Sequence, residues 1–263
     1  MYNLASYLLK GPVHSIKEST YKAVFRDGRI LKGAKTRDSI DTEDVFYHFN
    51  EDGNLTEIVY YDLEGAEVKK ESLTYNKNGV VQELLNIHKH GVEYRTVYLS
   101  DENGKIIGQK NYYKRDFFLD VYIDVFDKKG NYIGHESYDE DGNITGSSVY
   151  ILNEKGAEIE FLHYGSSGRL LSRAFSYYDD NGKLYERVSY NNCQIHKIIY
   201  RFDSQKNPTE EIVYKSKNTI EEHRKYQYSF DALGNWVKKV IYENGIPVKI
   251  VEREIKHYQS TDI

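Results

Sequence analysis

Residues 178–190 read Tyr-Asp-Asp-Asn-Gly-Lys-Leu-Tyr-Glu-Arg-Val-Ser-Tyr, a polar turn followed by a single strand. The Asp that begins the turn can accept hydrogen bonds from the backbone two residues on, and Gly182 supplies the positive φ that closes a hairpin loop. Beyond the turn, side chains alternate between the two faces of a strand, so Glu186, Val188 and Tyr190 share one face. The stretch predicts a β-hairpin unit and not a helix.

The same unit recurs along the chain, in two interleaved series of turns that each repeat every 25 to 27 residues. The first series runs Gly53, Gly79, Gly104, Gly130, Gly156, Gly182, Asn207 (in place of glycine) and Gly234. The second runs Gly65, Gly91, Asp116, Gly142, Gly168, Cys193, Thr219 and Gly245, with three of the glycines replaced. A turn at each end of every strand makes successive strands antiparallel. The sequence therefore predicts an all-β antiparallel meander of about eight two-strand repeats that forms a curved, spiral or partly closed sheet.

The period assigns residues 47–258 to the repeat array and leaves the first part of the chain outside it. In residues 1–46, a strand is expected over 13–25, a hairpin turn at 26–29 and a polar loop over 33–44. The end of a repeat array has an open edge that must be covered. We expect residues 1–46 to cap that edge and residues 259–263 to be a tail, all in a single structural domain.

Composition restricts the classes of function. The net charge of −5 offers no basic surface for nucleic acid. No apolar run reaches the roughly 18 residues of a membrane helix, so we expect no transmembrane segment. The first ten residues lack the pattern of a signal peptide. This predicts a cytoplasmic protein if Met1 is the native start, and otherwise a protein exported to the envelope or surface whose signal has been removed.

Charged residues recur at fixed positions on these strands. Four residues beyond the first-series turn positions stand five glutamates: Glu57, Glu83, Glu160, Glu186 and Glu211. Basic residues stand near the facing positions of the next strands: Lys69, Arg95, Arg173, Lys197 and Arg224. Opposite charges across a strand pair stabilise its register by about 0.2–1 kcal/mol each. We expect a register-fixing ladder, with a charged binding groove as the alternative.

The turn phrases resemble those of a known repeat family. Tyr61-Asp62, Tyr138-Asp139 and Tyr178-Asp179, each followed by a turn glycine, are similar to the phrase of the YD-repeat (Rhs-type) family, over about residues 45 to 258. In Phe202-Asp203 and Phe230-Asp231, phenylalanine replaces the tyrosine of the phrase. The resemblance implies a long β-meander that forms a toxin shell or a surface module, in some members linked to carbohydrate binding. The hairpin repeats of MORN-type proteins are a second resemblance.

One break in the second series is rich in aromatic residues. Where the period requires a glycine at Asp116, residues 112–118 read Tyr-Tyr-Lys-Arg-Asp-Phe-Phe. Aromatic residues and Arg are typical of interface residues that dominate binding. We predict a binding site made of Tyr112, Tyr113, Arg115, Phe117 and Phe118, with at least two of the aromatic side chains exposed. An irregular turn that packs its own rings is the alternative. Two further breaks, at 191–193 and 215–218, fall in the same series.

The sequence offers little for catalysis, and we expect no enzyme, no cofactor and no metal site. His88 and His90 stand on one strand face but flank a turn, which favours solvated histidines over a metal pair. Asp139-Glu140-Asp141-Gly142-Asn143 resembles the start of a calcium loop, but no Glu follows at the closing position. Cys193 has no base in view.

These observations lead to three hypotheses of function. The first is a non-catalytic binding protein that recognises another protein, with an immunity or accessory protein of a toxin system as a special case. The second is a carbohydrate-binding surface protein that uses its Tyr rows as stacking platforms. The third is an enzyme with a dispersed carboxylate site, because paired carboxylates suffice for glycoside hydrolysis.

Overall fold

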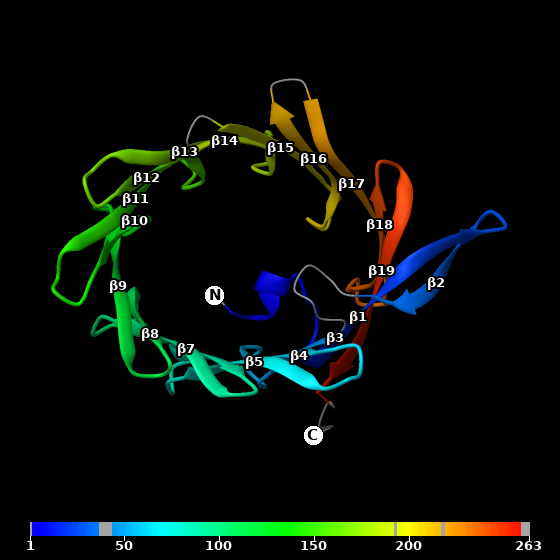
Figure 1. The fold of residues 1–263 in the computed structure, drawn as a ribbon, viewed down its shortest axis with the longest axis horizontal. Coiled ribbons are helices and arrows are strands. Elements are labelled where there is room, and N and C mark those ends of the chain that lie inside the picture. Colours follow the sequence, from blue (N-terminus) through cyan, green and yellow to red (C-terminus); the bar gives the residue numbers. More distant parts are fainter. Residues whose placement is uncertain (1, 37–43, 192–193, 217–218, 259–263) are drawn as a thin grey trace. The chain divides into compact units, whose positions relative to one another are not determined.

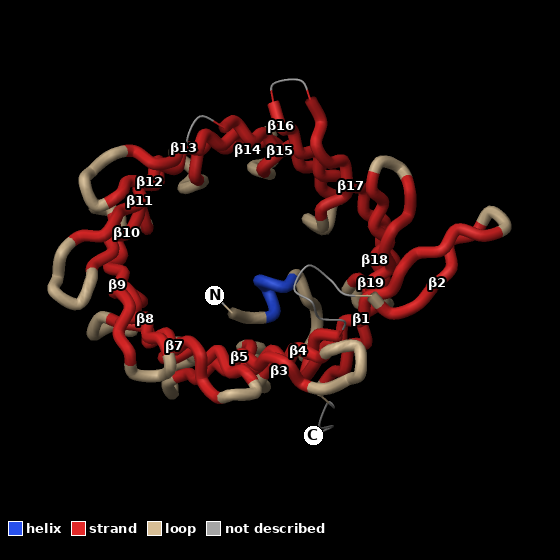
Figure 2. Tube along the Cα trace, viewed as in Figure 1, coloured by secondary structure: helices blue, strands red, loops and turns tan. Residues whose placement is uncertain are grey.

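In a computed structural model, residues 2–36, 44–191, 194–216 and 219–258 are described, and they are almost entirely β-structure. One sheet holds 19 strands, and the single helical element of the described residues is the 3₁₀ helix η1 (Leu4–Tyr7) (Figures 1 and 2). No helix in this part of the chain is long and apolar enough to cross a membrane. The expected all-β antiparallel meander is confirmed.

The chain divides into two compact units, whose boundaries fall inside strands β7 and β17. Unit 1 comprises the described residues up to Arg95 and from Lys225 on, and unit 2 comprises Thr96–Arg224. The strands of unit 1, with the two shared strands, are β1 (Val13–Arg26), β2 (Arg29–Lys35), β3 (Asp44–Phe49), β4 (Leu55–Tyr61), β5 (Glu67–Tyr75), β6 (Val81–His88), β7 (Gly91–Ser100), β17 (Thr219–Phe230), β18 (Trp236–Glu243) and β19 (Ile246–His257). Those of unit 2 are β8 (Ile106–Tyr113), β9 (Phe117–Phe126), β10 (Tyr132–Tyr138), β11 (Ile144–Leu152), β12 (Glu158–Gly165), β13 (Leu170–Tyr178), β14 (Leu184–Asn191), β15 (Gln194–Phe202) and β16 (Pro208–Ser216).

The first-series turns have the expected chemistry. In the turn after β13, the Asp179 carboxylate accepts from the backbone N–H of Lys183 at 2.8 Å, while the Asp179 carbonyl accepts from Gly182 N–H at 2.9 Å. All seven first-series glycines have positive φ. In the seventh turn of the series, which lacks a glycine, the position is filled by Lys206, with φ of 71°, and not by Asn207. The period therefore places that turn one residue too late.

The ends of the meander are joined, which corrects the expectation of a spiral or partly closed sheet. Strand β1 lies between β19 and β3 and is hydrogen-bonded to both, with Ile16 opposite Ile255 on one side and Tyr47 on the other. The first part of the chain thus closes the meander instead of capping an open edge. Closure removes the free strand edges that a repeat array would have to cover.

The segment before β1 fastens this closure within unit 1. Its N-terminal end pairs with the turn after β3, where Leu55 N–H donates to the Tyr2 carbonyl at 2.8 Å. Its C-terminal end is held by the turn before β18. There the Asn235 side chain accepts from Lys10 N–H at 2.7 Å and donates to the Lys10 carbonyl at 3.1 Å. Residues 2–12 therefore connect the first turn of the series, at residues 50–54, with its last turn, at residues 231–235.

A hydrophobic core also lies here. A buried cluster joins the segment before β1 to strands β1, β3, β4 and β5 and consists of Leu9, Val13, Ile16, Phe49, Leu55, Ile58 and Leu73. Tyr7 of η1 packs edge-to-face on Tyr47 and Phe49, with ring centroids 5.4 and 5.7 Å apart. This non-repeated part of the chain supplies the apolar burial that a single sheet layer lacks.

The charge ladder is present, with two differences from the sequence expectation. Glu83 pairs with Arg95 at 2.5 Å, and Glu160 with Arg173 and Glu186 with Lys197 at 2.6 and 2.7 Å. Glu57 pairs with Lys70 at 3.1 Å and not with Lys69, which bonds Glu71 on the opposite face.

The fifth rung is formed by Glu210 and not by Glu211, because Lys206 holds the turn position one residue earlier. Glu210 binds Arg201 at 2.7 Å and His223 at 2.8 Å, and Arg224 pairs with Glu222. The ladder is therefore favoured over a charged groove.

Candidate functional site

A continuous row of polar side chains crosses six adjacent strands of unit 2, on the face opposite the ladder. Cross-strand neighbours follow one another from β9 to β14 in the order Asp124, His135, Ser148, His163, Ser172 and Asn191. We call this the polar row, and the face that carries it the row face. Each member lies on a different strand, so the row exists only because the six strands pair in this register.

At one end of the row, His135 lies among titratable groups. The Tyr132 hydroxyl is 3.0 Å from His135 Nδ1, and the Tyr122 ring packs against the imidazole at a centroid distance of 5.1 Å. Burial lowers the pKa of His135 and the nearby His163 lowers it further, while Asp124 opposes both. Burial raises the pKa of Asp124. This end of the row therefore favours a neutral imidazole.

In the middle of the row, Ser148 Oγ lies 3.1 Å from His163 Nδ1. The His163 ring is parallel to the Phe161 ring, and Tyr132, Tyr150 and Phe161 form a chain of rings with centroids 5.4 and 5.2 Å apart. Ser148 is only 4% exposed. A Ser beside a His is the geometry of an activated nucleophile, but here the hydroxyl is shielded from solvent.

A second polar network lies closer to the first-series turns on the same face. Glu158 accepts from Arg187 at 3.0 Å, and Arg187 also donates to the Ser176 hydroxyl at 3.3 Å. The Tyr178 hydroxyl donates to the Glu158 carbonyl at 2.7 Å. Between the polar row and the turns, the row face therefore carries paired charges beside the aromatic rings.

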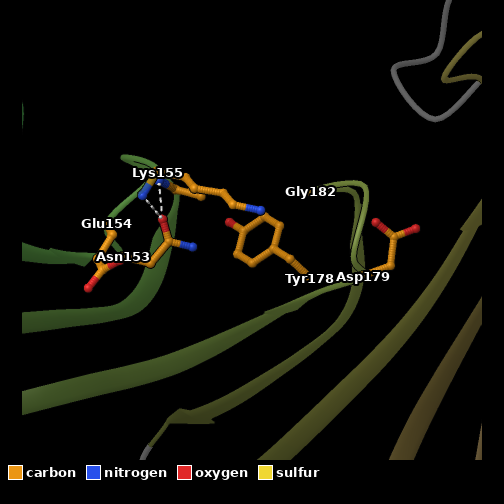
Figure 3. A pocket seen from close by; sticks show the side chains of 7 residues that line it. Asn153, Glu154, Lys155, Tyr178, Asp179 and Gly182 are labelled. Carbon is orange, nitrogen blue, oxygen red and sulfur yellow. Dashed lines mark hydrogen bonds between the residues drawn. The ribbon is translucent and has the colours of Figure 1, made fainter.

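Tyr178 also lines a groove of about 510 Å³ between two successive first-series turns (Figure 3). Asn153, Glu154 and Lys155 form one wall, and Asp179 and Gly182 belong to the other. Asn153 accepts from the backbone N–H groups of Lys155 and Ala157 at 2.9 and 3.0 Å, and the Lys155 side chain extends toward Tyr178.

A similar groove of about 490 Å³ lies on the other side of the 153–157 turn. Lys155 and Glu154 line both grooves and present opposite charges side by side. The edge has the chemistry to hold small polar molecules.

The opposite face of β9 is apolar. Leu119, Val121, Ile123 and Val125 alternate with Asp120, Tyr122 and Asp124, and three of the four aliphatic side chains are exposed. Gly134 of β10 lies between Val125 and Val149, so no side chain interrupts the apolar surface there. In this strand the alternation divides apolar from polar almost completely.

The site predicted from the sequence lies at the turn between β8 and β9. Lys114 and Arg115 have φ of 45° and 74°, and Tyr113 faces Phe117 across the turn. Phe117 is 67% exposed, whereas Phe118 packs edge-to-face on Tyr112 at 5.8 Å. One aromatic side chain is therefore exposed and not the expected two, because the others pack across the hairpin. Binding at Tyr112, Tyr113, Arg115, Phe117 and Phe118 stays a prediction.

The remaining sequence candidates have structural explanations. His88 Nε2 lies 2.9 Å from Glu93, and the described residues hold no cluster of three metal-ligating side chains. The Asp139 carboxylate accepts from the backbone N–H groups of Asp141 and Asn143, which is turn chemistry. Cys193, and parts of the breaks at 191–193 and 215–218, lie outside the described residues.

The polar row had no signal in the sequence analysis. Its members are separated by 9 to 19 residues and belong to no single motif. A tabulation of both strand faces, and not only of the recurrent Glu face, would have shown the alternation of Ser and His.

Comparison with known proteins gives likeness in structure only. No protein-family model matches the chain, and no curated protein matches it. Among solved structures, a porin-like protein from Bacteroides uniformis is 13% identical with a TM-score of 0.48, over 94% of this chain and 98% of that one. A porin-like protein from Bacteroides vulgatus is 12% identical with a TM-score of 0.30, over 78% and 96%. The TcdB2-TccC3-Cdc42 structure is 10% identical with a TM-score of 0.24, over 88% of this chain and 20% of that one.

The closed meander corrects several expectations. The interpretation as an open YD-repeat or MORN-type array is wrong, because β1 joins the two ends of the meander. The hypotheses of a toxin-system partner protein and of a carbohydrate-binding surface protein depended on that open array, and they are not retained. The hypothesis of a dispersed carboxylate enzyme depended on free glutamates, which the ladder pairs with basic residues, and it is not retained either.

Two statements about location also change. The cytoplasmic expectation is given up in favour of the envelope alternative, which is proposed below from the closure of the meander. The expectation of no transmembrane segment considered apolar helices alone. It does not hold for strands that pair into a closed sheet, because such a sheet can also lie in a membrane.

The shifted pKa of His135 predicts a pH-dependent stability. An unfolded His titrates near pH 6.5, and in the folded chain burial lowers this pKa. As pH falls through about 6.5 the unfolded chain therefore binds the proton more readily, and the folded state loses stability. We expect the loss of melting temperature between pH 8 and pH 5.5 to be smaller in His135→Gln than in the parent. His90→Gln, at an exposed turn, is the control; equal losses in all three proteins would contradict the prediction.

Proposed function

We propose that the protein works in the cell envelope as a porin-like closed meander, with its row face turned toward water and hydrophilic solutes. The observation that carries the proposal is the insertion of β1 between β19 and β3. A closed antiparallel sheet bonds its backbone donors and acceptors internally, and this is the form of β-structure that a membrane environment tolerates.

The alternation in β9 supports the same proposal, while farther along unit 2 the face opposite the row carries the paired charges of Glu160–Arg173 and Glu186–Lys197. In β9 the aliphatic side chains lie on one face, while Asp120 and Asp124 lie on the other. Strands of envelope barrels alternate in this way, with one face in an apolar medium and the other toward water. The polar row and the Glu158–Arg187 pair extend the polar surface across the neighbouring strands.

We also propose that the protein is not an enzyme. The Ser148–His163 pair is the nearest approach to a catalytic arrangement, and Ser148 is almost fully buried. Asp124 lies beside His135 and not beside His163, so it does not orient the imidazole that faces the serine. A catalytic triad requires a nucleophile, a histidine beside it and a carboxylate that orients that same histidine.

Fractionation of the source cells tests the proposal. We expect the native protein to be recovered with envelope markers, in the membrane or the soluble envelope fraction, and to be depleted from the cytoplasm at least about tenfold relative to a cytosolic enzyme marker. Recovery of most of the protein with the cytosolic marker would overturn the proposal.

A further inference from the structure

The hairpin formed by the ends of β1 and β2 extends beyond the rest of the sheet of unit 1. The pairing of β1 with β19 ends at Lys22 and Lys249, whereas the pairing of β1 with β2 continues from Ala23 to Arg26. Figure 1 shows the β1–β2 turn standing away from β18 and β19. Over its last four residue pairs this hairpin has no other strand neighbour among the described residues.

Both faces of the hairpin tip carry apolar side chains. Phe25 faces Ile30 on one side of the ribbon, and Val24 faces Leu31 on the other. Phe25 is 66% exposed, and Val24 and Leu31 are exposed as well. A tip that is apolar on both faces exposes to water a contiguous apolar surface of the kind that marks an interaction site.

The tip is cationic in a chain that is acidic. Residues 22–32 contain Lys22, Arg26, Arg29 and Lys32 against Asp27 alone, a net charge of four minus one, or +3, whereas the whole chain carries −5. Arg26 lies 3.6 Å from Asp27, and Lys32 binds Glu252 at 2.7 Å. Arg29 has no ion-pair partner among the described residues.

The tip is also preformed. Asp27 and Gly28 have φ of 52° and 74°, the two left-handed residues of a tight two-residue hairpin turn. A Cβ at Gly28 would meet no atom within 4 Å, so the glycine serves the backbone conformation and not packing. A rigid tip loses little conformational freedom on binding.

We propose that this hairpin tip binds an anionic membrane surface, with its apolar pairs in the headgroup and acyl boundary and its arginines on lipid phosphates. Apolar residues bordered by cations are the chemistry of interfacial anchors, and arginine matches phosphate geometry. A membrane surrounds an inserted tip and so uses both apolar faces, whereas a folded protein partner covers one face. The proposal rests on the proposed envelope location.

Vesicle flotation with the purified full chain tests the assignment. We expect binding to vesicles of phosphatidylcholine with about 30% phosphatidylglycerol, and at least about tenfold weaker binding to phosphatidylcholine alone or in high salt. Phe25→Ser and Leu31→Ser, one on each face, should each weaken binding about fivefold or more. The double variant Arg26→Ser with Arg29→Ser should remove the preference for the anionic lipid.

Ile246→Ser is the matched control. Ile246 is equally exposed, at 66%, and follows the two-residue turn at Asn244 and Gly245, but Glu243 makes its surroundings acidic. We expect its vesicle binding to equal that of the parent. Near-ultraviolet circular dichroism confirms that each variant is folded.

Two results would overturn the membrane assignment: no binding of the parent to anionic vesicles, or an equal loss in Ile246→Ser. A loss from only one of the two faces would overturn the insertion of the tip, because it would mean that the hairpin lies on the lipid surface with that face alone. These outcomes are independent of fractionation. A cytoplasmic protein that binds vesicles would refute the envelope proposal alone, and an envelope protein that does not bind them would refute the hairpin alone.

Discussion

Ile16→Ala is expected to destabilise the protein by about 2–5 kcal/mol, the range for emptying a large aliphatic position in a packed core. Ile16 is fully buried and lies where β1 joins β19 and β3. Its loss leaves a cavity among Leu9, Val13 and Phe49, in the cluster that holds the closure. Denaturant unfolding followed by tyrosine fluorescence measures the effect.

Ile123→Ala is the control for this substitution, because Ile123 belongs to the exposed side of β9 in unit 2. We expect it to cost less than about 1 kcal/mol, since the removed atoms were already in water. Equal destabilisation by the two substitutions would mean that the closure is not the most tightly packed part of the fold.

Asn235→Ala is expected to cost roughly 2–4 kcal/mol, because it removes several hydrogen bonds of a buried side chain, including the two to Lys10. Asn235 is 1% exposed, and its amide satisfies both the N–H and the carbonyl of Lys10 while also bonding Asp231. Besides the lower melting temperature, we expect faster amide exchange in residues 2–12, which this side chain anchors.

The matched control is Asn131→Ala. Asn131 fills the same turn position and donates to Asp127 at 2.8 Å, but its side chain is exposed. A turn contact of this kind is worth about 1 kcal/mol or less. If Asn131→Ala destabilised as much as Asn235→Ala, the contribution would come from the turn and not from the fastening of the N-terminal segment.

The local structure could be predicted from the sequence because its causes are local. An Asp or Asn followed three residues later by a glycine fixes each turn through contacts within five residues, as at Asp179 and Gly182. The ladder was predictable for the same reason, since a hairpin turn sets which residues face each other. Where a lysine replaced glycine at position 206, the pattern misplaced the turn and selected Glu211 in place of Glu210.

The candidate sites were harder to predict from the sequence. The aromatic turn at 112–118 was predicted as a binding site because it breaks the period, yet Tyr112 and Phe118 pack on each other. The polar row was not predicted, because each member looks like an ordinary strand residue until six strands align. The exposed hairpin tip at Phe25 was recognised as a turn, but its isolation from other strands depends on where β19 ends.

The sequence alone determined the all-β class, the antiparallel order, nearly every turn and most of the ladder, because these follow from backbone preferences and contacts between neighbours in the chain. Only the tertiary structure decided that the meander closes. The pairing of Ile16 with Ile255 joins residues more than 200 positions apart, and nothing in either strand records its partner. Burial decides it, because the segment before β1 and the strands β1, β3, β4 and β5 form the core together, and neither part buries its apolar side chains alone.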